Sequence, residues 1–123
     1  MELNKVTELI IGAAFEVSNI VGVGFLEKVY ENALAVELRG RGLKVGQQAP
    51  MVIKYKQAIV GEYIADLLVE DQVLVELKIV DRLHPIHRAQ CLNYLKATDL
   101  SLALLINFGK PRVQYERIIN SPQ

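Results

Sequence analysis

Residues 60–80 read VGEYIADLLVEDQVLVELKIV, with apolar runs on both sides of a polar triplet at residues 70–72. Runs rich in Val, Ile and Leu that flank a short polar turn predict a β-hairpin, here with strands over residues 60–69 and 73–80. If all three polar residues form the turn, Asp66 lies opposite Glu76. A two-residue turn would shift the pairing by one residue and place Asp66 on the other face of the sheet.

Asp66, Glu76 and Lys78 are charged residues that lie among the apolar residues of these strands. Glu76 and Lys78 are two residues apart, so their side chains leave the same face. Burying a charge is costly unless it is paired or bound to an ion. A structural salt bridge would satisfy Glu76 and Lys78, whereas the carboxylates of Asp66 and Glu76, about 5 Å apart across the hairpin, would share one cation. Carboxylates without imidazole or thiolate partners suit Mg²⁺ or Mn²⁺.

The flanking sequence predicts two helices before the hairpin and a helix–strand unit after it. Apolar residues recur at helical spacing near the N-terminus and again after Pro85, which suits the first turn of a helix. The apolar run after that helix predicts a buried strand parallel to the strand before it, in a right-handed crossover. The expected elements are helices over 3–19, 25–39 and 85–98, and strands from 50, over 60–69, 73–80, 102–106 and 113–119, with a frayed tail at 120–123.

The composition limits the class of protein. The chain has 123 residues, about half of them apolar, and we expect a single domain over residues 1–123 with an α/β fold. Fourteen Lys and Arg balance fourteen Asp and Glu, so the broad basic field of many nucleic-acid-binding proteins is absent. The single cysteine, Cys91, excludes an intramolecular disulfide, and no apolar stretch reaches the roughly 18 residues of a membrane span. These features indicate a cytoplasmic protein.

Other polar residues have a spacing that suits a site. His87, Gln90 and Tyr94 share one face of the helix predicted over 85–98, although an exposed polar face has the same pattern. Glu27 lies in the first turn of the second helix, where a carboxylate also complements the helix dipole without any function. Several cations would either follow the phosphates of a nucleic acid or point separately to solvent: Lys54, Lys56, Arg82, Arg88 and Lys96.

Together these residues resemble a known family. Residues 24–30, GFLEKVY, match the signature GxxExxY, and the similarity continues through residues 65–66, 76–78 and 87–96. From about residue 5 to residue 119, the chain is similar to the GxxExxY protein family of the PD-(D/E)XK nuclease superfamily. The resemblance implies an αβββαβ core in a mixed sheet flanked by helices, here with an extra N-terminal helix and a C-terminal edge strand. Residue 65 is Ala where the superfamily name records Pro, at a position that carries no ligand.

The resemblance also implies a metal site. Glu27, Asp66 and Glu76 correspond to acidic ligands of Mg²⁺ or Mn²⁺, and the backbone carbonyl of Leu77 corresponds to a further ligand. A bound divalent ion would supply the local positive charge that this neutral chain lacks.

Three residues correspond to the catalytic machinery. Lys78 matches the lysine that positions the attacking water, and Gln90 and Tyr94 match a QxxxY motif that orients the lysine or contacts the phosphate. The implied activity is metal-dependent hydrolysis of phosphodiester bonds in nucleic acid, with DNA preferred as the substrate and RNA as the other choice. Because a chain of this size offers little surface to hold a duplex, we also expect a homodimer.

Two other functions agree with the same residues. A non-catalytic interaction module for nucleic acid or protein would keep the fold and the acidic site without turnover. A hydrolase of nucleotides or other small phosphoesters would use the same metal chemistry on a smaller substrate.

Overall fold

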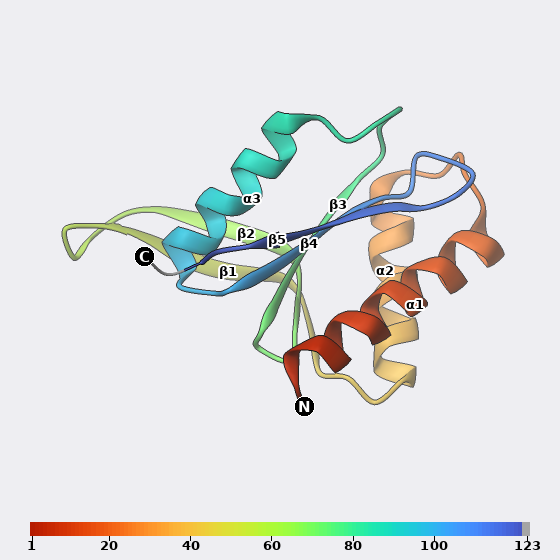
Figure 1. The fold of residues 1–123 in the computed structure, drawn as a ribbon, viewed down its shortest axis with the longest axis horizontal. Coiled ribbons are helices and arrows are strands. Elements are labelled where there is room, and N and C mark those ends of the chain that lie inside the picture. The colour runs from red at the N-terminus through yellow and green to blue at the C-terminus, as the bar shows by residue number, and fades with distance from the viewer. Residues whose placement is uncertain (122–123) are drawn as a thin grey trace.

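The computed structural model describes residues 1–121, in which three helices accompany a five-stranded sheet (Figure 1). The elements are α1 (Leu3–Val21), α2 (Glu27–Gly40), β1 (Val45–Tyr55), β2 (Ala58–Val69), β3 (Val73–Lys78), α3 (Pro85–Thr98), β4 (Leu102–Asn107) and β5 (Gln114–Ile119). The predicted α/β class and element order are confirmed. Within this range no helix combines the length and the apolar character that crossing a membrane requires.

The strands lie across the sheet in chain order, from β1 at one edge to β5 at the other. The pair β3–β4 is parallel and the other neighbours are antiparallel, so the sheet is mixed, as predicted. The crossover from β3 to β4 passes through α3, and β5 is the predicted C-terminal edge strand.

The hairpin of β2 and β3 has the predicted register. Val69 pairs with Val73, and the pairing continues to Leu67 with Val75. Three residues therefore form the turn, and two of them, Glu70 and Asp71, adopt left-handed φ angles of 54°. Within the described residues the ladder between these strands ends at Leu67 and Val75.

Two apolar clusters hold the sheet from its opposite faces. One cluster lies under α1 and α2 and the other under α3, which lies on the other side of the sheet (Figure 1). Strand β4 is buried along its whole length, as the uninterrupted apolar run at residues 102–106 predicts. Alternate residues of β4 contribute to the two clusters, with Leu104 in the first and Leu105 in the second.

Midway along β1 and β2, the side chains that faced one side of the sheet change to the other side. Side chains two residues apart in a regular strand share a face, yet Ala65 packs in the cluster under α3 and Leu67 packs in the cluster under α1 and α2. The change falls at Asp66. Opposite it, Gln48 has a left-handed φ of 50°, and the pairing of the two strands skips this position.

Several boundaries differ from prediction. Strand β1 begins at Val45 instead of residue 50, since it pairs with β2 from that residue onward. Strand β3 ends at Lys78 instead of residue 80, because the backbone of Val80 is bonded to the Asn107 side chain. The predicted fray is wrong at Asn120, whose N–H donates to the carbonyl of Ser101 at 2.9 Å, and residues 122–123 lie outside the described range.

Candidate active site

Beyond the last pair of their ladder, β2 and β3 separate, and acidic side chains occupy the fork between them. The Leu77 N–H donates to Asp66 Oδ2 at 2.8 Å, and the Asp66 N–H donates to Glu76 Oε1 at 3.4 Å. The fork therefore brings together Asp66 and Glu76, the two residues that the predicted register places opposite each other. At Leu77, the backbone N–H is the group bonded to Asp66.

Glu27 approaches the fork from the start of α2. Partial burial raises the pKa of Glu27, and the nearby Asp66 carboxylate raises it further, whereas the charge of Lys78 lowers it. Glu27, Asp66 and Lys78 are therefore close neighbours, although they come from three different elements. Repulsion between two adjacent carboxylates is relieved when a cation binds between them.

The loop before Glu27 is fixed by a tyrosine. The hydroxyl of Tyr30 donates to the carbonyl of Gly22 at 2.5 Å and accepts from the N–H of Phe25 at 3.4 Å. Gly24 has a φ of 111°, a backbone conformation that residues other than glycine rarely adopt. Since Tyr30 is buried and stacks on Phe108 with centroids 5.0 Å apart, the entry to α2 is anchored in the core.

Glu76 is the most deeply buried of the three predicted acidic ligands. Burial raises its pKa to about 7, a hydrogen bond from Tyr63 opposes that change, and the Asp66 carboxylate adds to it. The ring of Tyr63 stacks on Tyr94, with centroids 3.7 Å apart and an angle of 16°. Tyr94 thus contacts the residue that holds Glu76, which places it beside the fork.

Lys78 and Gln90 occupy less enclosed positions. Lys78 is half-buried at the end of β3, and none of the four ion pairs among residues 1–121 includes it. Its charge lowers the pKa of both Glu27 and Glu76, so it lies near both carboxylates. Gln90, one turn before Tyr94, faces solvent, and no side-chain hydrogen bond in the described part of the chain holds it.

The donor chemistry of this site fits a hard divalent cation, because the side chains predicted as ligands are all carboxylates. In residues 1–121, however, no three His, Cys, Asp or Glu side chains gather closely enough to hold a metal ion. One oxygen of Glu76 accepts a hydrogen bond from the Tyr63 hydroxyl, and one oxygen of Asp66 accepts a hydrogen bond from the Leu77 N–H. The three carboxylates are therefore neighbours that do not converge on one point.

Two residues near the site were missed by the sequence analysis. Tyr63 has no local signal, because its contacts with Glu76 and Tyr94 arise only in the folded chain. Glu31 is 2% exposed and accepts hydrogen bonds from Lys28, Gln47 and Gln48 at 2.6–3.1 Å. Its position four residues after Glu27, on the same helix face, is a signal that was available.

The loop after Lys78 is held by a third residue that was missed. Asn107 is fully buried and pairs with Lys78 in the parallel ladder. Its side chain accepts from the Val80 N–H at 3.1 Å and donates to the Val80 carbonyl at 2.9 Å. A Cβ at Gly109 would lie 2.6 Å from Val80 backbone atoms, so only glycine permits this close approach. These contacts fix the chain as it leaves the site.

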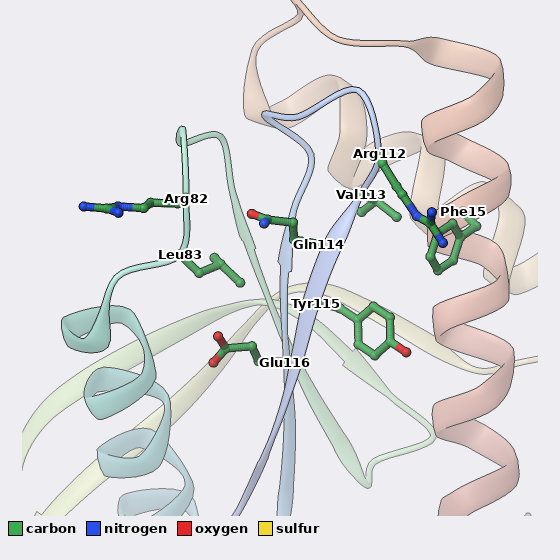
Figure 2. Close-up of a pocket in the computed structure, with 8 residues that line it drawn as sticks. All are labelled: Phe15, Arg82, Leu83, Arg112, Val113, Gln114, Tyr115 and Glu116. Carbon is green, nitrogen blue, oxygen red and sulfur yellow. The ribbon is translucent and has the colours of Figure 1, made fainter.

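A cavity of about 440 Å³ lies apart from the fork, between α1, β5 and the loop that enters α3 (Figure 2). The side chain of Arg82 points away from Tyr115 on the far side of this cavity (Figure 2). None of the residues predicted to bind the metal or to act in catalysis lines it. The lining residues are Phe15, Arg82, Leu83, Arg112, Val113, Gln114, Tyr115 and Glu116.

Comparisons with known proteins bear on the family and the fold. A family model described as the PD-(D/E)XK nuclease superfamily matches residues 4–118. The solved structure of SSO0001 has a TM-score of 0.61 and 17% sequence identity over 98% of this chain, which spans 60% of that protein's length. An alkaline exonuclease (LHK-Exo) from Laribacter hongkongensis has a TM-score of 0.56 and 16% identity, with coverage of 96% of this chain and 69% of that chain. No curated protein matches. At these identities the structural similarity shows the fold alone.

Proposed function

Because the chain belongs to the PD-(D/E)XK nuclease superfamily, we propose that it is a metal-dependent nuclease that hydrolyses phosphodiester bonds in DNA or RNA. The observation that supports this most directly is the fork between β2 and β3. There Asp66 accepts a hydrogen bond from the Leu77 N–H, Glu76 accepts one from the Asp66 N–H, and Glu27 lies beside Asp66. Nuclease chemistry needs such a group of carboxylates to hold its cation.

The acidic residues would hold the metal. Glu27, Asp66 and Glu76 would bind Mg²⁺ or Mn²⁺, with the Leu77 carbonyl as a further ligand. When bound, the ion would polarise the phosphate and lower the pKa of the attacking water. Tyr63 donates to Glu76 and restricts the orientation of that carboxylate.

The remaining residues would act on the phosphate. Lys78 would donate to a phosphate oxygen and stabilise the negative charge that develops there, since no ion pair among residues 1–121 engages it. Tyr94, held by its stack on Tyr63, and Gln90, which faces solvent on the same helix, would orient the lysine or contact the phosphate.

The test combines metal binding with cleavage. Calorimetric titration with Mg²⁺ and Mn²⁺ should detect binding to the wild type that Asp66→Asn abolishes, and the exposed control Glu8→Gln should bind like the wild type. Labelled single-stranded and double-stranded DNA and RNA should be cut with Mn²⁺ or Mg²⁺ and not with EDTA. Unchanged cleavage by purified Asp66→Asn would refute the proposal.

A specific observation favours a second candidate, a non-catalytic interaction module for nucleic acid or protein. In the described residues no three potential metal ligands converge, and Glu76 is bonded to Tyr63. Such a module would bind nucleic acid equally well with or without EDTA and would cut none of the four substrates. The same titration and cleavage assay therefore separates the two candidates.

The proposal keeps three further expectations from the sequence. Residues 1–123 would act as one domain, in the cytoplasm, where the buried free thiol of Cys91 suits reducing conditions. The protein would also form a homodimer, and sedimentation equilibrium at increasing concentration measures that directly.

A further inference from the structure

The hairpin of β1 and β2 extends well beyond the rest of the sheet. Only the last three residues of β2, Leu67–Val69, pair with β3, whereas the pairing of β1 with β2 continues to Tyr55 and Ala58. Figure 1 shows this hairpin projecting away from α1 and α2. We call residues 49–65 the arm. Its base is covered by α3, and its other face exposes Val52 and Ile64.

The tip of the arm carries two cations beside an aromatic ring. Tyr55 is 62% exposed, and Lys56 Nζ lies 5.4 Å from the centroid of its ring. Lys54 is also exposed, and neither lysine takes part in an ion pair among residues 1–121. The one acidic residue in the sequence of the arm, Glu62, lies farther from the tip, opposite Val52. The tip therefore has a local positive charge on a chain with no net charge.

The turn at the tip has residues with side chains at two positions whose backbone conformation favours glycine. Lys56 and Gln57 form a two-residue turn with φ angles of 48° and 71°, both left-handed. Such turns favour Asn-Gly, because residues other than Gly, Asn and Asp are disfavoured at positive φ. Lys56 and Gln57 are therefore unfavourable residues for this backbone conformation, whereas the exposed Lys56 side chain can contact an anion.

The other cations predicted to contact phosphates have different surroundings. Arg88 is paired with Glu116 at 2.6 Å, and Arg82 lines the cavity of Figure 2. Lys54 and Lys56, in contrast, lie two residues apart at the tip of the arm.

We propose that the tip of the arm, through Lys54, Tyr55 and Lys56, binds the backbone of the nucleic acid at a distance from the site. This inference rests on the proposed nuclease function, since it assigns the arm to the same substrate. Asp66 lies eight residues after Ala58, which at about 3.3 Å per residue places the tip about 26 Å from the fork. A duplex rises about 3.4 Å per base pair, so the tip reaches phosphates about eight base pairs from the fork.

Nucleic acid suits this tip better than a second copy of the chain does. A two-fold contact between tips would bring the same lysines together, and like charges disfavour association. Phosphates supply the missing negative charge, and the exposed ring of Tyr55 offers a surface on which a base or sugar can pack.

The test measures binding to labelled duplexes in EDTA, where no metal-dependent cleavage occurs. Lys54→Gln combined with Lys56→Gln should weaken binding to a duplex of about 24 base pairs and reduce the slope of log affinity against log salt by about 2. The same double variant should bind a duplex of about 6 base pairs like the wild type, because that duplex cannot reach both places. The control Lys5→Gln with Lys44→Gln removes two exposed cations elsewhere and should leave the slope unchanged.

A second variant separates the lost contact from any loss of structure. Lys56→Asn with Gln57→Gly installs the preferred turn, so its melting temperature should equal or exceed that of the wild type. Its salt slope on the long duplex should still fall by about 1, because one phosphate contact is lost.

Several outcomes would overturn the proposal. These are an unchanged salt slope in the double variant, an equal loss on both duplexes, a wild type that binds neither duplex, or a dimer that depends on Lys54 and Lys56 in sedimentation. Length-dependent binding without any cleavage would instead reject the nuclease proposal and leave the arm as a binding element.

Discussion

Replacing Glu76 with Gln should stabilise the metal-free protein while removing a proposed metal ligand. Glu76 is 9% exposed, and burial raises its pKa to about 7 from the ordinary value of 4.5. Gln has nearly the same shape, keeps an oxygen that accepts the hydrogen bond from Tyr63, and carries no charge. The substitution therefore removes a buried charge and preserves the packing around it.

The size of the effect follows from the pKa. One pKa unit corresponds to about 1.4 kcal/mol, so the difference between 4.5 and about 7 corresponds to about 3 kcal/mol. Because the pKa of Glu76 is higher in the folded than in the unfolded chain, its protonation favours the folded state below about pH 4.5. That stability is lost as the pH rises through about 7. Glu76→Gln should therefore match the wild type near pH 4 and exceed it by up to about 3 kcal/mol near pH 8.

Urea unfolding in EDTA, followed by circular dichroism near pH 4, 6 and 8, measures this difference. Glu8→Gln, at an exposed position on α1, controls for the loss of one negative charge. Added Mg²⁺ should then stabilise the wild type and leave Glu76→Gln unchanged, because only ligand bound to the folded state adds stability. A variant less stable than the wild type near pH 8, or a difference that does not change with pH, would refute the reasoning.

Three further predictions concern residues around the site and the core. Tyr63→Phe should cost about 1–3 kcal/mol in urea unfolding, because it removes a hydrogen bond to a buried carboxylate, and a cost no greater than that of Tyr94→Phe would contradict this. Burial raises the pKa of Cys91 to about 12 from 9, so iodoacetamide near pH 8 should label it about 1,000-fold more slowly in the native than in the urea-unfolded protein, as followed by mass spectrometry. Leu104→Ala, in a strand buried on both faces, should cost about 2–5 kcal/mol in the same unfolding assay, and a cost below about 1 kcal/mol would mean that the cluster repacks around it.

The sequence was sufficient to predict the elements that depend on local pattern. The polar triplet at residues 70–72 marked the turn and left two registers open, and the structure has the one in which all three residues form the turn. The run at residues 102–106 was identified as a strand buried on both faces, because a half-exposed strand would alternate.

Prediction failed where long-range contacts decide the outcome. At the start of the second helix the apolar residues do not mark the buried face, because Leu26 and Val29 are 82% and 41% exposed whereas Glu31 is buried. Glu31 is stabilised there by hydrogen bonds from Gln47 and Gln48 of β1. Hydrophobic periodicity contains no information about partners that lie sixteen and seventeen residues away, so it assigns a carboxylate to the surface.

The same limit applies to the change of face of β2 at Asp66, because the alternating pattern of residues 63–69 does not reveal it. Apolar residues at 63, 65, 67 and 69 suggest one buried face, yet the first two pack under α3 and the last two under α1 and α2. A strand held by clusters on both sides must rotate between them, and this rotation coincides with the end of its pairing with β3. The N–H groups of Asp66 and Leu77 are then bonded to carboxylates in the fork. Packing of β2 against the two apolar clusters thus also creates the fork. The free energy gained from this packing offsets the cost of burying Glu76, so a small sheet tolerates adjacent carboxylates.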